Sequence, residues 1–167
     1  WVDGKFGKAL HFDGTNDHVT LGDGVALGLD KSAEFTFSAW IKLDRSGDYP
    51  MVISKDGTAL NLRLDSNRRL PALRIEAKNY TAPAGNEVPV GEWHQVASTY
   101  HDAENKIRLY KDGLQVGEFT FTGTVNTTGS AAYVGRRSDG YYFPGAIDDL
   151  RVYRIALSGS EIAELYG

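Results

Sequence analysis

The feature that most constrains the fold of this chain is an alternation of apolar and polar residues with a period of two. Between Phe35 and Leu43 almost every second residue is apolar, and Leu60, Leu62 and Leu64 repeat the pattern. Successive side chains of a β-strand point to opposite faces of a sheet, so this alternation is typical of strands with one buried face. We therefore expect an all-β protein.

The rest of the chain favours many short strands and one helix. Turn signals such as Asp112-Gly113 and Asp139-Gly140 separate further β-rich runs, and helical periodicity is almost absent. This organisation predicts an antiparallel two-sheet β-sandwich, or jelly roll. Ser158 and Glu161 have capping-box spacing and predict one short helix near the end. The further strands are expected near residues 70–76, 93–101, 105–111, 114–121, 131–135 and 145–154.

Length and charge restrict the domain organisation and the partners. A chain of 167 residues with 41% apolar residues fits one domain, residues 1–167. Its net charge is -4 and its Lys and Arg residues are scattered, so we expect no nucleic-acid partner. No run approaches the roughly 18 apolar residues of a membrane span, and no signal peptide is recognisable. The absence of cysteine leaves the compartment open. Because the chain opens at Trp1 without Met, we expect a module of a longer protein.

Oxygen-bearing side chains crowd into DGTNDHV, residues 13–19, directly after an expected strand. Asp13, Asn16 and Asp17 carry the hard oxygen ligands that calcium prefers, and Gly14 allows a tight backbone turn. The same residues also form ordinary polar hairpin turns, and their spacing is not that of the helix-loop-helix calcium motif. From these residues alone, both interpretations stay open.

Four segments, which together span nearly the whole chain, carry a family resemblance. They are GKFGKALHFDGTNDHVTLG, EFTFSAWIKLD, GEWHQVASTYHDAENKIRLYKDGLQVGE and AAYVGRRSDGYYFPGAIDDLRVYRIALSGSEIAELYG. The closing pattern, from Gly145-Ala146 through Ile147-Asp148-Asp149 to Glu161-Ile162, is the most specific part. In this order the segments resemble the laminin G-like jelly-roll modules of the concanavalin A-like lectin superfamily.

The resemblance implies two curved antiparallel sheets, commonly with a calcium ion that pins the N-terminal loop to the last long strand. Asp13, Asn16, Asp17 and Asp148 then map onto an oxygen cage that backbone carbonyls and water complete. Such a metal would be structural. The alternative, in which Asp17 and Asp148 only accept hydrogen bonds from turn amides, stays open. Asp149 should point to the opposite face of its strand.

The sequence carries no complete catalytic motif. Related sandwich enzymes that hydrolyse β-glucans use Glu-x-Asp-x-x-Glu on one strand, and this spacing does not occur. An alginate-lyase-like site would need further motifs besides Arg74-Ile75-Glu76, the one match. We therefore expect a noncatalytic domain, whatever its parent protein does. The histidines lie in expected strands or at their edges without an obvious Ser or Asp partner, and they are His11, His18, His94 and His101.

Two adjacent rows of polar residues predict a ligand surface. If the leucines of residues 60–64 face the core, Asn61 and Arg63 face outward, and Arg74 lies on the polar side of the next strand. The same rows also suit an ordinary solvated face. In related modules, planar polar side chains bond sugar hydroxyls and aromatic rings stack on sugar faces. Trp40 and Trp93 are expected to be structural. The candidate ligand-binding residues are Asn61, Arg63, Arg74, Tyr80, Arg136, Tyr141 and Tyr142.

Residues and resemblance together predict a noncatalytic carbohydrate-binding module of a larger secreted bacterial or cell-surface protein. Its expected partners are a polysaccharide or other glycan and the other domains of its parent protein, and its expected location is extracellular or at the cell surface. The alternative is a protein-interaction or adhesion module, because function resides in sites rather than in folds. The third hypothesis is a small polysaccharide lyase or hydrolase with an unrecognised site.

Overall fold

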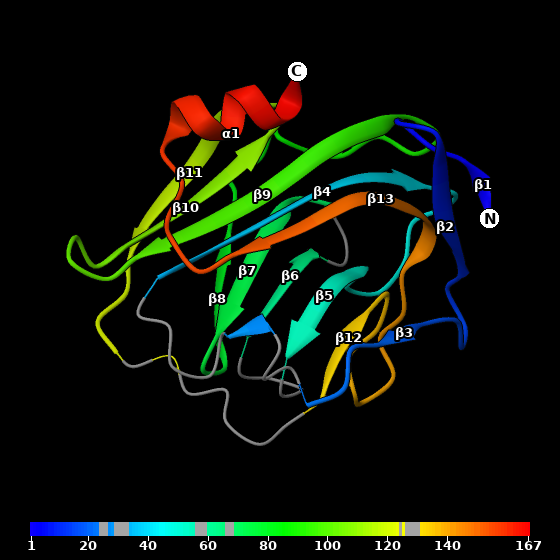
Figure 1. The fold of residues 1–167 in the computed structure, drawn as a ribbon, viewed down its shortest axis with the longest axis horizontal. Helices are drawn as coiled ribbons and strands as arrows, with labels where there is room; N and C mark the ends of the chain where they lie inside the picture. Colours follow the sequence, from blue (N-terminus) through cyan, green and yellow to red (C-terminus); the bar gives the residue numbers. More distant parts are fainter. Residues whose placement is uncertain (24–26, 29–33, 56–59, 66–68, 124, 126–130) are drawn as a thin grey trace.

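The structure is a computed structural model that describes residues 1–23, 27–28, 34–55, 60–65, 69–123, 125 and 131–167. It confirms the all-β prediction, with two antiparallel sheets and one short helix at the end of the chain (Figure 1). No helix in these ranges has the length and apolar character of a membrane span. The elements are β1 (Val2–Asp3), β2 (Lys8–Asp13), β3 (Val19–Thr20), β4 (Phe35–Leu43), β5 (Met51–Lys55), β6 (Leu60–Leu64), β7 (Pro71–Ile75), β8 (Lys78–Thr81), β9 (Trp93–His101), β10 (Lys106–Lys111), β11 (Leu114–Thr120), β12 (Ala132–Val134), β13 (Pro144–Tyr153) and α1 (Gly159–Tyr166).

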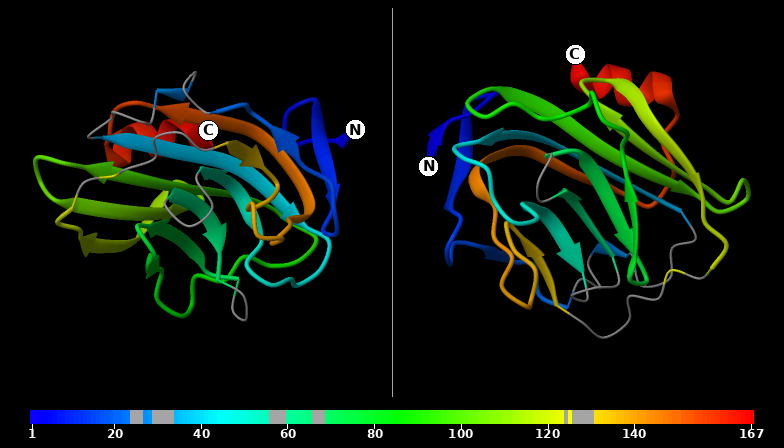
Figure 2. Two further views of the ribbon diagram at one scale, coloured as in Figure 1. Left: turned by 90° about the horizontal axis from the view of Figure 1, so that it is seen from below. Right: turned by 180° about the vertical axis from the view of Figure 1, so that it is seen from behind.

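The two sheets lie face to face, and the hydrophobic core fills the space between them. One sheet has seven strands in the order β1-β2-β13-β4-β9-β10-β11, and the other has six in the order β3-β12-β5-β6-β7-β8. Figure 2 shows that α1 lies on the outer side of the seven-stranded sheet. The core contains alternate apolar residues of both sheets, among them Phe37, Ile41, Leu62, Leu73 and Val96.

Strand β4 is buried on both faces, which alternation alone does not predict. Its apolar row enters the core, and its other row is covered by the C-terminal segment. The hydroxyl of Thr36 donates to the carbonyl of Ile155 over 2.8 Å, and the ring of Trp40 stacks on Tyr166 with centroids 5.2 Å apart. Trp40 is therefore buried as expected, but beneath the helix rather than between the sheets.

The predicted capping box of α1 is present. Ser158 Oγ accepts a hydrogen bond from the amide of Glu161 at 3.3 Å, and the Glu161 carboxylate accepts one from the amide of Ser158 at 2.7 Å. These bonds satisfy amides that the first helical turn leaves without intrahelical partners. Ile162 is buried and packs with Leu157 and Tyr110 in a second, smaller core beneath the helix.

The register of the six-stranded sheet aligns polar residues in a row across its outer face. Tyr133 of β12 lies opposite Ser54 of β5, and Ser54 lies opposite Asn61 of β6. Asn61 lies opposite Arg74 of β7, which lies opposite Asn79 of β8. This row points away from the core, because the residues that flank it along the strands include Ile53, Leu60, Leu62, Leu73, Ile75, Tyr80 and Val134, which belong to the core or pack against it.

Candidate functional site

We call the outer surface of the six-stranded sheet, formed by Ser54, Asn61, Arg63, Arg74, Asn79 and Tyr133, the polar face. Asn79 is exposed and Arg74 is half-buried. By contrast, Asn61 and Arg63 are 0% and 2% exposed, although they point away from the core. The sequence predicted both as solvent-facing contacts, and this part of the prediction is wrong because other groups cover them.

Arg63 supports its neighbours from within the polar face. Its Nη2 donates to Asn79 Oδ1 over 2.8 Å, and its guanidinium lies 4.6 Å from the ring centroid of Tyr49. Burial, and then the positive charges of Arg74 and Arg137, lower the pKa of Arg63 to about 10. The side chain still carries its charge at neutral pH and positions an amide and an aromatic ring.

A chain of stacked side chains continues from Tyr49 toward the edge of the sheet. The rings of Tyr49 and Tyr141 meet edge to face with centroids 5.4 Å apart, and the guanidinium of Arg137 lies 4.4 Å from the centroid of Tyr141. Arg137 also forms an ion pair with Asp139 and holds the pKa of that carboxyl below its ordinary value. Aromatic and cationic groups thus fix one another in place.

A pocket of about 290 Å³ opens beside these rings. It is built by the turn after β2, the segment after β4 and the residues before β13. Arg45 in this lining donates from both terminal nitrogens to the carbonyl of Asp13 at 3.3 Å. The lining residues are Gly14, Arg45, Gly47, Asp48, Gly140, Tyr141, Tyr142 and Pro144.

Arg136 anchors the end of the polar face nearest β12. Its guanidinium lies 4.8 Å from the ring centroid of Tyr133 and 5.8 Å from that of Tyr142. Its Nη1 lies 3.3 Å from Nε2 of His18, while Ser54 donates to its backbone carbonyl over 2.7 Å. Polar and aromatic groups therefore extend from β8 across the sheet to the turn after β2.

Tyr80 is the one predicted ligand-binding residue that lies on the wrong side of the sheet. Its ring packs against Phe119 and Phe121, with centroids 5.6 and 6.3 Å away, and joins the core between the sheets. Strand alternation gives the reason, because Asn79 points outward and its neighbour must point inward. The six predicted residues that do lie on the polar face or its rim are Asn61, Arg63, Arg74, Arg136, Tyr141 and Tyr142.

Sequence reasoning missed several residues of this site, among them Ser54, Asn79 and Tyr133 of the polar face and Tyr49 beside it. Asn79 had a usable signal, since it pairs with Arg74 in a hairpin whose alternation is visible. Tyr49 had none, because it lies in the segment between β4 and β5, where no periodicity indicates which way a side chain points.

The turn after β2 is held by hydrogen bonds of its own. Asp13 Oδ1 accepts from the amides of Thr15, Asn16 and Asp17 at 2.7, 3.0 and 3.3 Å. Asp17 Oδ2 in turn accepts from the amide of Asp13 at 3.0 Å. These backbone donors, Asn16 first, hold the pKa of Asp13 below its ordinary value. The geometry is that of a polar turn, and calcium at this turn stays a prediction.

Asp148 does not lie beside that turn. Strand β13 pairs with β2 so that Pro144 is opposite Asp13, which puts Asp148 four positions, or roughly 13 Å, further along the strand. Its carboxylate accepts from the amides of Phe6 and Asp149, both at 2.8 Å. The four predicted ligands therefore do not form one cage. The described part of the chain holds no group of three or more His, Cys, Asp or Glu side chains arranged for a metal ion.

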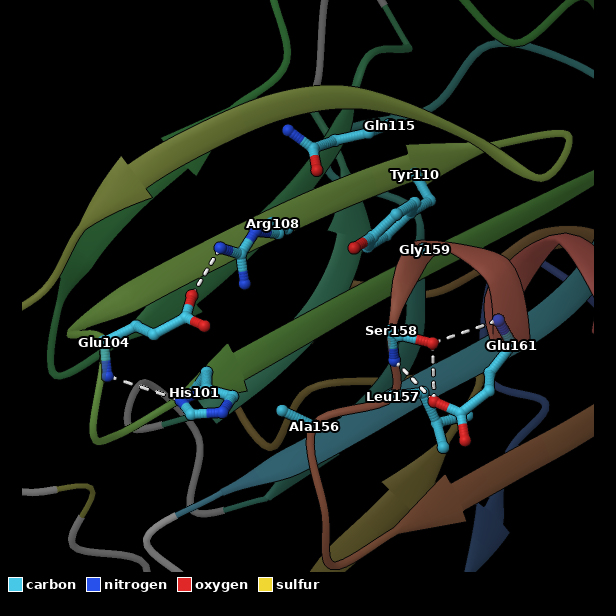
Figure 3. A pocket seen from close by; sticks show the side chains of 10 residues that line it. All are labelled: His101, Glu104, Arg108, Tyr110, Gln115, Ala156, Leu157, Ser158, Gly159 and Glu161. Atoms are coloured by element: carbon cyan, nitrogen blue, oxygen red, sulfur yellow. Dashed lines mark hydrogen bonds and ion pairs between the residues drawn. The ribbon is translucent and has the colours of Figure 1, made fainter.

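A second pocket, of about 360 Å³, lies on the other sheet beside α1 (Figure 3). Figure 3 shows Arg108 directed toward Glu104, and Ser158 toward Glu161. Arg108 is also bonded to Glu118. Arg108 in this lining is therefore paired with two carboxylates.

Two histidines have aspartate partners that the sequence did not reveal. His94 Nδ1 lies 2.8 Å from Asp112 Oδ2, and His11 Nε2 lies 2.6 Å from Asp44 Oδ2. In the described ranges no serine hydroxyl is bonded to either ring. The two pairs alone therefore do not make the nucleophile, base and acid of a hydrolytic triad.

Comparison with known families and sequences gives one match. The family model of the concanavalin A-like lectin/glucanases superfamily matches residues 13–163, which is most of the chain. No curated protein matches the chain.

Several solved structures share the fold. Domain 4 of AbnA, a GH43 extracellular arabinanase from Geobacillus stearothermophilus in complex with arabinotriose, matches with a TM-score of 0.81 and 22% identity, over 99% of this chain and 80% of that one. The CBM40 of Ruminococcus gnavus IT-sialidase bound to alpha2,3 sialyllactose matches with a TM-score of 0.74 and 16% identity, over 96% and 97%. A heptameric SAP-like pentraxin from Limulus polyphemus matches with a TM-score of 0.70 and 17% identity, over 94% and 80%.

Proposed function

The chain belongs to the concanavalin A-like lectin/glucanase superfamily, and from that premise we propose that it is a noncatalytic carbohydrate-binding module of a larger secreted bacterial or cell-surface protein. The observation that carries the proposal is the polar face with its rim pocket. There, tyrosine rings lie next to arginine, asparagine and aspartate side chains, and several of these groups hold one another in place.

This set of groups suits a sugar. Tyr141 and Tyr142 line the pocket and give flat apolar surfaces on which the C–H face of a pyranose or furanose ring stacks. Arg45 and Asp48 in the same lining supply a donor and an acceptor for hydroxyl groups. A shallow site with a few fixed polar groups and aromatic walls gives orientation as well as contact.

The structural neighbours support the same proposal. Domain 4 of the arabinanase was solved with arabinotriose, and the CBM40 module with sialyllactose. Both share this fold, and the arabinanase is extracellular by name. An extracellular or cell-surface location and glycan partners for this chain follow from the proposal.

A noncatalytic role rests on the sequence. The Glu-x-Asp-x-x-Glu spacing of related glucanases does not occur in it. Product release from candidate polysaccharides incubated with the purified domain would contradict this part of the proposal.

A structural calcium ion at the turn after β2 is a further part of the proposal, now without Asp148. Asp13, Asn16 and Asp17 are exposed oxygen-bearing residues within one turn. Backbone carbonyls and water would have to complete the roughly six to eight oxygens that calcium takes. The ion would stiffen a turn that contributes Gly14 to the pocket.

Glycan-array binding followed by titration calorimetry tests the proposed function. Tyr141→Ala and Tyr142→Ala should each weaken binding, because loss of a stacked ring removes about 1 kcal/mol of aromatic contact or more. Tyr80→Phe is the matched control and should bind like the unaltered protein, because Tyr80 faces the core. Absence of binding to every saccharide on a diverse array would refute the proposal and favour the protein-interaction alternative.

A further inference from the structure

Arginine side chains gather on the polar face of a protein whose formal net charge is -4. Arg63, Arg74 and Arg137 lie near enough that the charges of the last two both disfavour the charged form of Arg63. Asp139 pairs with Arg137, and Asp65 acts on Arg63 in the favourable direction. Burial and the positive charges of Arg74 and Arg137 outweigh the effect of Asp65, because the pKa of Arg63 falls to about 10.

Arg63 is the buried member of this arginine cluster. It is 2% exposed, its Nη2 bonds to Asn79, and its Nε has no hydrogen-bond partner among the described residues. A guanidinium has five N–H donors, so this charge is less well solvated than it would be in water. Charges in a weakly polarisable interior act on one another more strongly than charges in solvent.

Arg74 is the least buried of the three arginines. It is half-buried on β7, and its Nη1 lies 3.4 Å from Asn79 Oδ1, the oxygen that Arg63 also bonds. Asn79 itself is exposed beside it. The planar fork of a guanidinium matches the two oxygens of a carboxylate, which accept two parallel N–H bonds.

We propose that the glycan bound at the polar face carries a carboxylate, and that Arg74 donates hydrogen bonds to it in front of the buried Arg63. The inference rests on the proposed carbohydrate-binding function and names the class of sugar. A neutral sugar would use the same donors through its hydroxyls but would leave the repulsion among the arginines in place. A uronic or sialic acid residue relieves that repulsion and gains charge-assisted hydrogen bonds.

The decisive measurement compares each acidic saccharide with its own methyl ester, which keeps the ring and hydroxyls but has no negative charge. An array would carry oligogalacturonate, oligoglucuronate and sialyl oligosaccharides in both forms, with arabinotriose as a neutral probe, and titration calorimetry would follow. We expect at least one acid to bind about tenfold more tightly than its ester, because one hydrogen bond to a charged group changes affinity by about this factor. The ratio should fall with rising salt, which screens the charges.

Two matched variants assign the effect to Arg74. Arg74→Gln keeps an N–H donor but removes the charge, so the ratio of acid to ester affinity should fall toward one. Arg151→Gln removes the same charge from β13 of the other sheet, where Arg151 pairs with Asp149. This control should keep the preference for the acid, and thermal unfolding of both variants verifies that they fold.

The outcomes separate this inference from the function on which it rests. Equal affinity for acid and ester, or binding of arabinotriose alone, would overturn the inference that the glycan carries a carboxylate. It would leave the proposed carbohydrate-binding function intact. Absence of binding to every saccharide would overturn the proposed function and the inference together. If the Arg74→Gln variant still prefers the acid to the ester, the role given to Arg74 is overturned.

Discussion

Arg63 shows at the scale of one residue how burial depends on neighbours rather than on strand position. It occupies an outward position of β6 between Leu62 and Leu64, as alternation predicts. The ring of Tyr49 and the side chain of Asn79 then contact it from above the sheet. Neither contact is visible in the local sequence of β6, so the pattern predicted the direction of the side chain but not its exposure.

Replacing Arg63 separates its role in binding from its role in stability. Arg63→Met keeps most of the volume and removes a poorly solvated charge, so we expect the free energy of unfolding to stay unchanged or to rise by about 1 kcal/mol. Glycan affinity should fall, because Asn79 and Tyr49 lose the group that positions them. Urea unfolding and titration calorimetry measure the two effects. A large loss of stability would show that Arg63 is chiefly a structural residue.

Tyr100 gives a prediction for alkaline pH. Burial first, and then the hydrogen bond that its hydroxyl donates to Asp102, raise the pKa of Tyr100 to about 12 from 10.0. The folded state thus holds this proton more tightly than the unfolded chain does. The resulting stabilisation is fully present below the unfolded pKa and is lost as the pH rises through the range up to the folded pKa.

The variant Tyr100→Phe tests this linkage. It cannot release the proton, so its free energy of unfolding should decline less steeply than that of the unaltered protein between pH 10 and pH 12. Denaturant unfolding at a series of pH values provides the measurement. Curves of equal slope would mean that Tyr100 does not govern the alkaline decline.

At the scale of the element, β13 departs from the regular strand that its sequence suggests. Its pairing with β4 shifts register between Asp148 and Arg151, and Asp149 adopts a φ of 45°. A bulge of this kind interrupts the alternation of faces. The expectation that Asp149 points opposite to Asp148 assumed an unbroken strand, which this element is not. The Asp149 side chain instead pairs with Arg151.

Helix α1 depends on its capping box, which the sequence predicted correctly. Ser158→Ala removes the oxygen that accepts from the Glu161 amide, and it should lower the free energy of unfolding by about 1 kcal/mol. Glu164→Ala, at an exposed helical position, is the control and should change stability little. Thermal unfolding compares the two variants, and equal effects would show that the cap contributes nothing specific.

Calcium binding is a property to test on the whole molecule. We expect calcium to raise the melting temperature relative to EDTA, because an ion bound only by the folded state stabilises it. Asp17→Asn should remove the rise. Asp148→Asn should keep it, since Asp148 lies roughly 13 Å along β13 from the position opposite the turn. Calorimetry of all three proteins provides the measurement, and an unchanged midpoint would leave a turn held by hydrogen bonds alone.

The site itself exists only at the scale of the whole molecule. Tyr49, Arg63, Asn79 and Tyr141 come from four separate parts of the chain. The pairing of β6, β7 and β8 brings Arg63 to Asn79, and ring contacts join Tyr49 to Arg63 and Tyr141 to Tyr49. No short stretch of sequence contains more than a fragment of this arrangement. The sequence therefore predicted some members of the candidate site, Arg63 and Tyr141 among them, but not how they support one another.

By itself, the sequence determined most of the strands, though not β5 or β8, as well as the capped helix, the family and the direction in which most strand residues point. These follow from local rules, because alternation and capping depend on residues a few positions apart. The tertiary structure alone decided that Arg63 is covered, that Tyr80 faces the core and that Asp148 lies apart from Asp13 and Asp17. These depend on register between distant strands and on which segments cover a sheet, and such long-range packing is not encoded in any local pattern.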